Sequence, residues 1–226
     1  MVRKGIKMKE EIVKIINYVK DITKEDEYHT KLTDLHIKDL EECYKDYSNN
    51  EIILRMFIKK YLSRIASEFF SSINNKNEHG NNEIAEKLFN KAAQIYPSND
   101  TIFNLIVFYM CNDTKPNYIL CYLWLKLINF DCEIPANDLN YIAAKLEMIN
   151  KEYDMAFELY QEAYKKDKKD KNVIYNLAHC YFDGIGTDID VKKACHFVEM
   201  ILQYKDSLLK DDVDNVFKKY DEIIGK

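Results

Sequence analysis

The sequence predicts an all-helical chain built from stacked pairs of antiparallel helices. Its 5 Gly and 3 Pro among 226 residues are too few for the tight turns of a many-stranded sandwich or barrel. Apolar residues make up 47% of the chain and charged residues 31%, which is the balance of a globular protein with a core. Corresponding positions on successive apolar segments, most of them small residues, also recur at separations of 40, 38 and 34 residues. A period of this length indicates a repeated helical hairpin.

The first 50 residues predict a helical hairpin of divergent sequence. Apolar residues recur with helical spacing at 8–21 and again at about 31–47, and the polar stretch 24–29 would link the two helices. We expect this hairpin to cover the first repeat of the array.

Four further hairpins follow, each marked by one crossing residue on its first helix and one on its second. The pairs are Ala66 with Ala85, Ile106 with Cys121, Ala144 with Ala156, and Ala178 with Ala194. Two helices approach closely where small side chains face each other, and larger residues fill the space beside them. The second hairpin departs from the pattern, since Ile106 stands where Ala or Gly is expected. One hairpin cannot bury its apolar faces alone, so each should stack on the next in a right-handed solenoid.

The last of these hairpins has the clearest motif. Residues 177–186 read Leu-Ala-His-Cys-Tyr-Phe-Asp-Gly-Ile-Gly, and Asp190 and Phe197 follow. We expect Gly184 and Gly186 to supply the positive φ angles of a widened turn. Without a preceding strand or a third glycine, this Gly-x-Gly does not indicate a phosphate-binding loop.

These motifs resemble those of the tetratricopeptide and Sel-type repeat superfamily over about residues 52–205. The run from Ala85 through Phe89 and Ala92 to Pro97 is similar to the second half of a tetratricopeptide repeat, position for position. The resemblance implies a non-catalytic scaffold or adaptor that binds a peptide or helical segment of another protein on its concave groove.

The motifs also predict how the chain is divided. We expect an N-terminal helical hairpin at 1–50, repeats at about 51–99, 100–136, 137–170 and 171–205, and a C-terminal capping helix at 206–226. Apolar residues between Asp211 and Ile224 would face the last repeat, with polar residues outward, as the end of a solenoid requires.

Charge and cysteine usage exclude several classes of protein. A net charge of −5 argues against nucleic-acid binding, which depends on Lys and Arg neutralising phosphates. No apolar run is long enough for a membrane span, and the charged N-terminus does not resemble a secretory signal. Six cysteines without CxxC spacing indicate neither a zinc ribbon nor a redox motif. We therefore expect a cytoplasmic protein without a cofactor.

The resemblance also implies where a partner would bind. In the family, ligands lie against the first helix of each repeat, at fixed offsets from its small residue. In this sequence those offsets include Lys60 and Ser63 in the first hairpin and Asp100 in the second. The expected groove residues are Phe70, Phe103, Met110, Tyr141, Lys145, Met148, Tyr175, His179, Phe182 and Asp183. Their aromatic and Met side chains would suit an apolar or amphipathic segment.

Three alternatives to a peptide groove remain open at this point. The chain could be a metal-binding or enzymatic protein that uses His179, Cys180, Cys195 and His196, although neighbours on one helix point about 100° apart. It could instead be a self-associating regulatory module, such as a homodimer. The apolar surface could also be covered by the N-terminal hairpin or simply pack between repeats.

Overall fold

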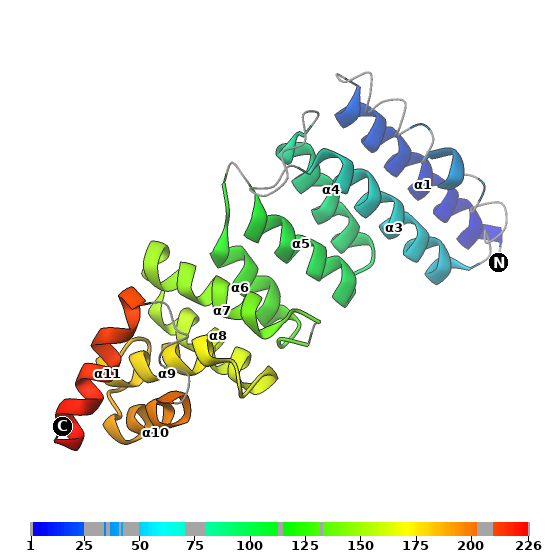
Figure 1. Cartoon of the computed structure of the whole chain (residues 1–226). Helices are drawn as coiled ribbons and strands as arrows, with labels where there is room; N and C mark the ends of the chain where they lie inside the picture. The colour runs from blue at the N-terminus through cyan, green and yellow to red at the C-terminus, as the bar shows by residue number, and fades with distance from the viewer. Residues whose placement is uncertain are drawn as a thin grey trace. The chain divides into compact units, whose positions relative to one another are not determined.

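The computed structural model describes residues 2–24, 34, 37–40, 42, 50–70, 80–112, 115–131, 133–202 and 210–225 (Figure 1). The chain divides into two compact units, Met1–Cys132 and Glu133–Lys226. The described residues contain helices and turns and no strand, so the predicted all-α fold class is confirmed.

The first unit contains α1 (Val2–Thr23), α3 (Glu51–Phe69), α4 (Asn82–Ile95), α5 (Asn99–Cys111) and α6 (Tyr118–Leu127). Helices α3 and α4 form one hairpin and α5 and α6 form the next, as predicted. Most of these helices begin where a side-chain oxygen accepts a hydrogen bond from the free backbone N–H groups of the first turn. In this unit the capping residues are Asn50, Asn81, Ser98 and Asn117.

The second unit contains α7 (Ala136–Lys145), the π-helical turn η1 (Leu146–Asn150), α8 (Tyr153–Lys166), α9 (Lys171–Asp183), α10 (Val191–Ile201) and α11 (Lys210–Ile224). Helices α7 and α8 form the third hairpin, and α9 and α10 form the fourth. Asp170 and Asp190 cap the helices of the fourth hairpin. The turn that joins these two helices has φ of 68° at Gly184 and 64° at Gly186, as predicted.

The predicted crossing residues are buried in three of the four hairpins. Ala66, Ala85, Cys121, Ala178 and Ala194 have no exposed surface, and Ile106 has 1%. The Cys121 thiol donates a hydrogen bond to the Ile106 carbonyl oxygen at 3.5 Å across the second hairpin. The predicted register of this hairpin is therefore confirmed, although its residues depart from the small-residue pattern.

The third hairpin requires a correction of one residue. Ala143 is fully buried, whereas Ala144, the predicted crossing residue, is partly exposed. The first helix of this hairpin ends in the π-helical turn η1, which holds one more residue per turn than an α-helix. The buried alanines Ala143 and Ala156 are 13 residues apart, one more than the predicted pair, and η1 lies between them. The prediction took Ala144 from its spacing of 34 residues to Ala178, which places the register one residue too late.

Helix α1 packs on one side of α3. Its buried residues Ile15, Ile16 and Val19 lie with Ile37 and Leu40 around a small apolar space against α3. On α3, the residues that line this space are Ile58, Tyr61, Leu62 and Ile65. The N-terminal helix was predicted to cover the first repeat in this way. Most of the second predicted helix, at about 31–47, lies outside the described residues.

Candidate functional site

A groove of about 450 Å³ lies between α3 and α5, the first helices of the first two hairpins. Its lining residues are Ile53, Met56, Phe57, Lys59, Lys60, Ser63, Asp100 and Asn104. Among them, Lys60, Ser63 and Asp100 are at ligand-contacting offsets that the repeat resemblance implies. This volume is within the roughly 300–1,000 Å³ typical of ligand pockets.

The groove and helix α1 occupy opposite sides of α3. Successive helical residues are 100° apart, so Ile53, Phe57 and Lys60 share one side of α3. Ile58, Leu62 and Ile65, which pack near α1, share the other. Helix α1 therefore leaves the groove open.

Apolar side chains form one end of the groove and polar side chains the other. Met56 is 46% exposed, and the neighbouring Ile52 is 65% exposed. At the polar end, the Lys59 ammonium lies 3.4 Å from Ser98 Oγ and 3.5 Å from Asp100 Oδ2. Lys59 is thus held in place by residues at the start of α5.

Ser63 contributes a buried polar atom at this end of the groove. Its Oγ makes no hydrogen bond with any part of the chain that the structure describes. A buried hydroxyl in this state costs free energy, which a hydrogen bond to an acceptor would recover.

The aromatic and Met residues expected in the groove of the first unit, Phe70, Phe103 and Met110, do not line it. Phe70 is half-buried, and its ring lies 5.3 Å from that of the buried Phe108. Phe103 and Met110 are also half-buried. Sequence reasoning missed five lining residues, Ile53, Met56, Phe57, Lys59 and Asn104. The family offsets begin six residues before Ala66, so they exclude the four on α3, and none of the offsets from Ile106 falls on Asn104.

On the third hairpin, the predicted residues Tyr141, Lys145 and Met148 lie at the surface. Tyr141 is exposed, and the Lys145 ammonium lies 5.1 Å from the centre of its ring. Met148 is exposed on the π-helical turn. With the crossing residue corrected to Ala143, these three residues are displaced by about 100° from the side chains that the family offsets describe.

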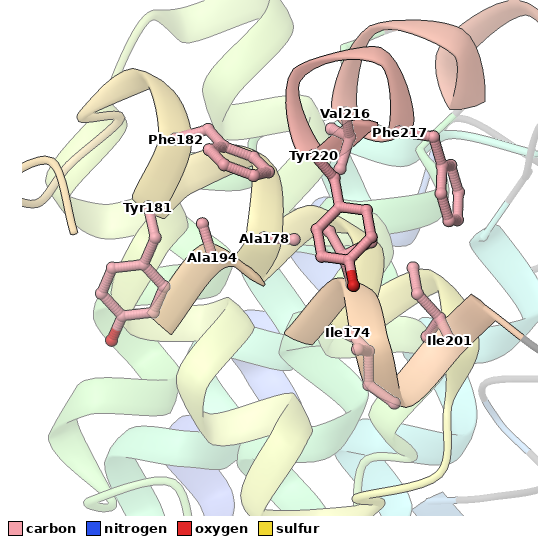
Figure 2. Close-up of a cluster of buried hydrophobic side chains, with 10 residues drawn as sticks. Ile174, Ala178, Tyr181, Phe182, Ala194, Ile201, Val216, Phe217 and Tyr220 are labelled. Atoms are coloured by element: carbon pink, nitrogen blue, oxygen red, sulfur yellow. The ribbon is translucent and has the colours of Figure 1, made fainter. Parts of the chain in front are cut away.

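The prediction that Phe182 lines an open groove is wrong. Phe182 is 7% exposed and belongs to a buried cluster with Val216, Phe217 and Tyr220 of α11. Figure 2 shows these side chains gathered between α9, α10 and α11. Tyr175 packs against the same cluster. The C-terminal helix, predicted as a cap, therefore covers the apolar side of α9 from which two groove residues were expected.

The remaining residues predicted on the fourth hairpin, His179 and Asp183, belong to a chain of polar contacts. His179 Nε2 lies 3.1 Å from Asp183 Oδ2, and its Nδ1 lies 3.9 Å from Glu147 Oε1. Asp183 also forms an ion pair with Lys219 of α11. These contacts join η1, α9 and α11 within the second unit.

A buried tyrosine completes this chain of contacts. The Tyr160 hydroxyl donates a hydrogen bond to Glu147 Oε2 at 2.9 Å. Burial and the adjacent Glu147 carboxylate raise the pKa of Tyr160 far above its usual range. The hydroxyl therefore stays protonated, and the contacts join elements of the fold rather than supply a reactive group.

The metal or enzymatic alternative placed His179, Cys180, Cys195 and His196 together. In the structure His179 lies beside the Glu147 and Asp183 carboxylates. Cys180 is buried, Cys195 is half-buried and His196 is exposed. Among the described residues, no group of three or more His, Cys, Asp or Glu side chains is arranged to hold a metal. The structure does not bring these four residues into one site.

Alkylation of the thiols tests their placement. Burial raises the pKa of Cys180, and the nearby Glu147 and Asp183 carboxylates raise it further. Because the thiolate is the reactive form, we expect native Cys180 to react with iodoacetamide at pH 8 at least roughly tenfold more slowly than Cys195. Peptide mapping by mass spectrometry would measure both rates, with urea-unfolded protein as the control. Equal native rates would contradict the buried position of Cys180.

No helix among the described residues has the length and apolarity needed to cross a membrane.

Comparison with known proteins finds similarity among solved structures. No family model and no curated protein matches the chain. The chain is similar to c5321, a protective antigen present in uropathogenic Escherichia coli strains that displays an SLR fold, with 15% identity and a TM-score of 0.41. That match covers 86% of this chain and 46% of the antigen, so the chain spans less than half of the antigen's length. It is also similar to a Sel1 repeat protein from Oxalobacter formigenes, with 16% identity, a TM-score of 0.41, and coverage of 90% of this chain and 85% of that one.

Proposed function

We propose that this chain is a protein-interaction scaffold that binds a segment of a partner protein in the groove between α3 and α5. The observation that carries the proposal is the open groove on the first-helix side of two adjacent hairpins, with Met56 46% exposed at its apolar end. When a partner covers an exposed apolar side chain beside a concave surface, removal of that side chain from water stabilises the complex.

The contrast with the fourth hairpin supports this placement. There the chain's own helix α11 covers the apolar side of α9, so Phe182 and Tyr175 are already packed. Between α3 and α5, Met56 remains exposed, and α1 packs on the other side of α3. The groove of the first unit is therefore the surface at which a partner segment would bury new apolar area.

Two matched substitutions test the proposal. Met56→Glu places a charge in the groove, whereas Met148→Glu places the same charge at a 66% exposed methionine on η1. We expect Met56→Glu to weaken partner binding by roughly 2 kcal/mol, as loss of a buried anchor does, and Met148→Glu to leave it within twofold. Both variants should keep the wild-type helical circular dichroism.

Affinity capture from a native lysate, quantified by mass spectrometry, would provide the measurement. The expected result is a set of proteins that the wild type and Met148→Glu recover and Met56→Glu does not. Equal recovery by both variants would contradict binding in the groove, and loss with Met148→Glu alone would move the binding surface to the third hairpin.

A further inference from the structure

Building on the proposed function, we infer that the groove selects an acidic amphipathic segment of its partner. Such a segment places an apolar side chain against Met56 and Phe57 and a carboxylate beside Lys60. The side chains that α3 contributes to the groove change along the helix from apolar to basic, and then to an unpaired hydroxyl, within three turns. We base the inference on this order of side-chain types.

The apolar part of this order is continuous along one side of α3. Ile53, Met56 and Phe57 are spaced three and four residues apart, so their side chains are neighbours on the groove side. Ile52, the exposed residue beside them, extends the apolar surface past the end of the groove. One or two large apolar side chains of a partner segment would fit against this surface.

The net charge of α3 is opposite in sign to the net charge of the whole chain. Helix α3 contains four basic and two acidic residues, whereas the chain has a net charge of −5. Arg55 forms an ion pair with Glu51, and Lys59 forms one with Asp100. Lys60 is exposed, and within the described parts of the chain it has no ion-pair partner. Among the described residues, the Lys60 ammonium is therefore a cation of the groove without an ion-pair partner, and it can pair with a carboxylate of the ligand.

The hydroxyl of Ser63 lies one helical turn beyond Lys60. It is buried in the groove wall and has no hydrogen-bond partner among the described residues, and Asn104 of α5 also lines the groove. A carboxylate beside Lys60 would accept a hydrogen bond from the Asn104 amide, and one from the Ser63 hydroxyl once this side chain turns toward the ligand. Because an unpaired buried donor is costly, this end of the groove favours an acceptor over an apolar group. In a helical ligand, the apolar residue and the acid would be three or four positions apart.

Selection of displayed random 12-residue peptides on the full-length chain tests the inference. We expect the selected peptides to combine large apolar residues with Asp or Glu. Replacing that acid by its amide should raise Kd about fivefold, the scale of a partly exposed ion pair, as measured by fluorescence polarisation. On Lys60→Glu, a Lys at the same peptide position should bind better than the acid. Lys168→Glu changes net charge equally at an exposed residue outside the groove and should leave the preference unchanged.

The outcomes separate this inference from the proposed function. Peptides that lose binding on Met56→Glu but show no acid preference would overturn the inference and leave groove binding intact. Peptides insensitive to Met56→Glu, or the absence of any selected peptide, would overturn the proposed function itself. Laurate, a free apolar acid, serves as a competitor. If it displaces every selected peptide and binds more tightly than they do, the groove takes a free apolar acid rather than a peptide segment, and the inference is overturned.

Discussion

Gly186→Ala should destabilise the second unit by more than about 3 kcal/mol. Gly186 has φ of 64°, and a Cβ atom added there would lie 2.1 Å from the carbonyl oxygen of Tyr153 and 2.8 Å from Phe157 Cβ. The nearest atoms belong to the backbone at the start of α8, so a rotamer change cannot relieve the overlap. The turn between α9 and α10 would have to move away from the preceding hairpin. Urea unfolding followed by circular dichroism would measure the change in the free energy of unfolding.

Gly184→Ala is the matched control for this prediction. Gly184 has φ of 68°, but a Cβ atom there would lie 3.1 Å from Ile189 Cγ1 and 3.3 Å from the Thr187 carbonyl oxygen. The exposed Ile189 side chain can shift, and the backbone contact needs only a small movement, unlike the overlap at Gly186. We expect a loss of about 1 to 2 kcal/mol, the cost of the left-handed conformation for an alanine. If both substitutions cost the same, close packing of the turn on α8 would not be the reason for glycine at 186.

Phe182→Ala should lower the free energy of unfolding by about 3 to 5 kcal/mol. The Phe182 ring packs in the buried cluster that joins α9, α10 and α11, with Val216 and Tyr220 among its members. Removing it leaves a cavity that Ala178 and Ala194 cannot fill, since neither has a side chain long enough to move into the space. Thermal and urea unfolding by circular dichroism would both report the loss.

Tyr141→Ala is the control for Phe182→Ala, because it replaces an aromatic residue outside the core. Tyr141 was predicted on the same groove as Phe182, but it is 41% exposed. Its replacement should change the free energy of unfolding by about 0.5 kcal/mol or less, as surface substitutions do. If Phe182→Ala kept the stability of the wild type but lost binding of a partner, Phe182 would belong to a binding surface. That result would contradict its place in the core.

The coverage of the fourth hairpin by α11 has a consequence for the whole candidate site. An apolar side chain on the first helix of a hairpin can face a partner or another helix of the chain. Phe182 faces α11, whereas Met56, at a different position of its repeat, faces the open groove. Apolar side chains on first helices therefore serve stability in the second unit and, as we propose, recognition in the first.

Local sequence patterns determined the helical pairs of this protein. Buried crossing residues such as Ala66 and Ala178 lie where helices must approach, so their spacing alone predicted which segments pair. Positive φ at Gly184 and Gly186 also followed from the sequence, because few other residues adopt that conformation without strain. These features depend on the chain within one hairpin.

Only the tertiary structure decided which sides of the helices stay open. It placed Phe182 under α11, and it brought Lys59 and Asp100 together across 41 residues. It also buried Ala143 rather than Ala144. The physical reason is that helical periodicity indicates which side of a helix is apolar but carries no record of the segment that covers it. That choice depends on contacts between parts of the chain that are distant in sequence.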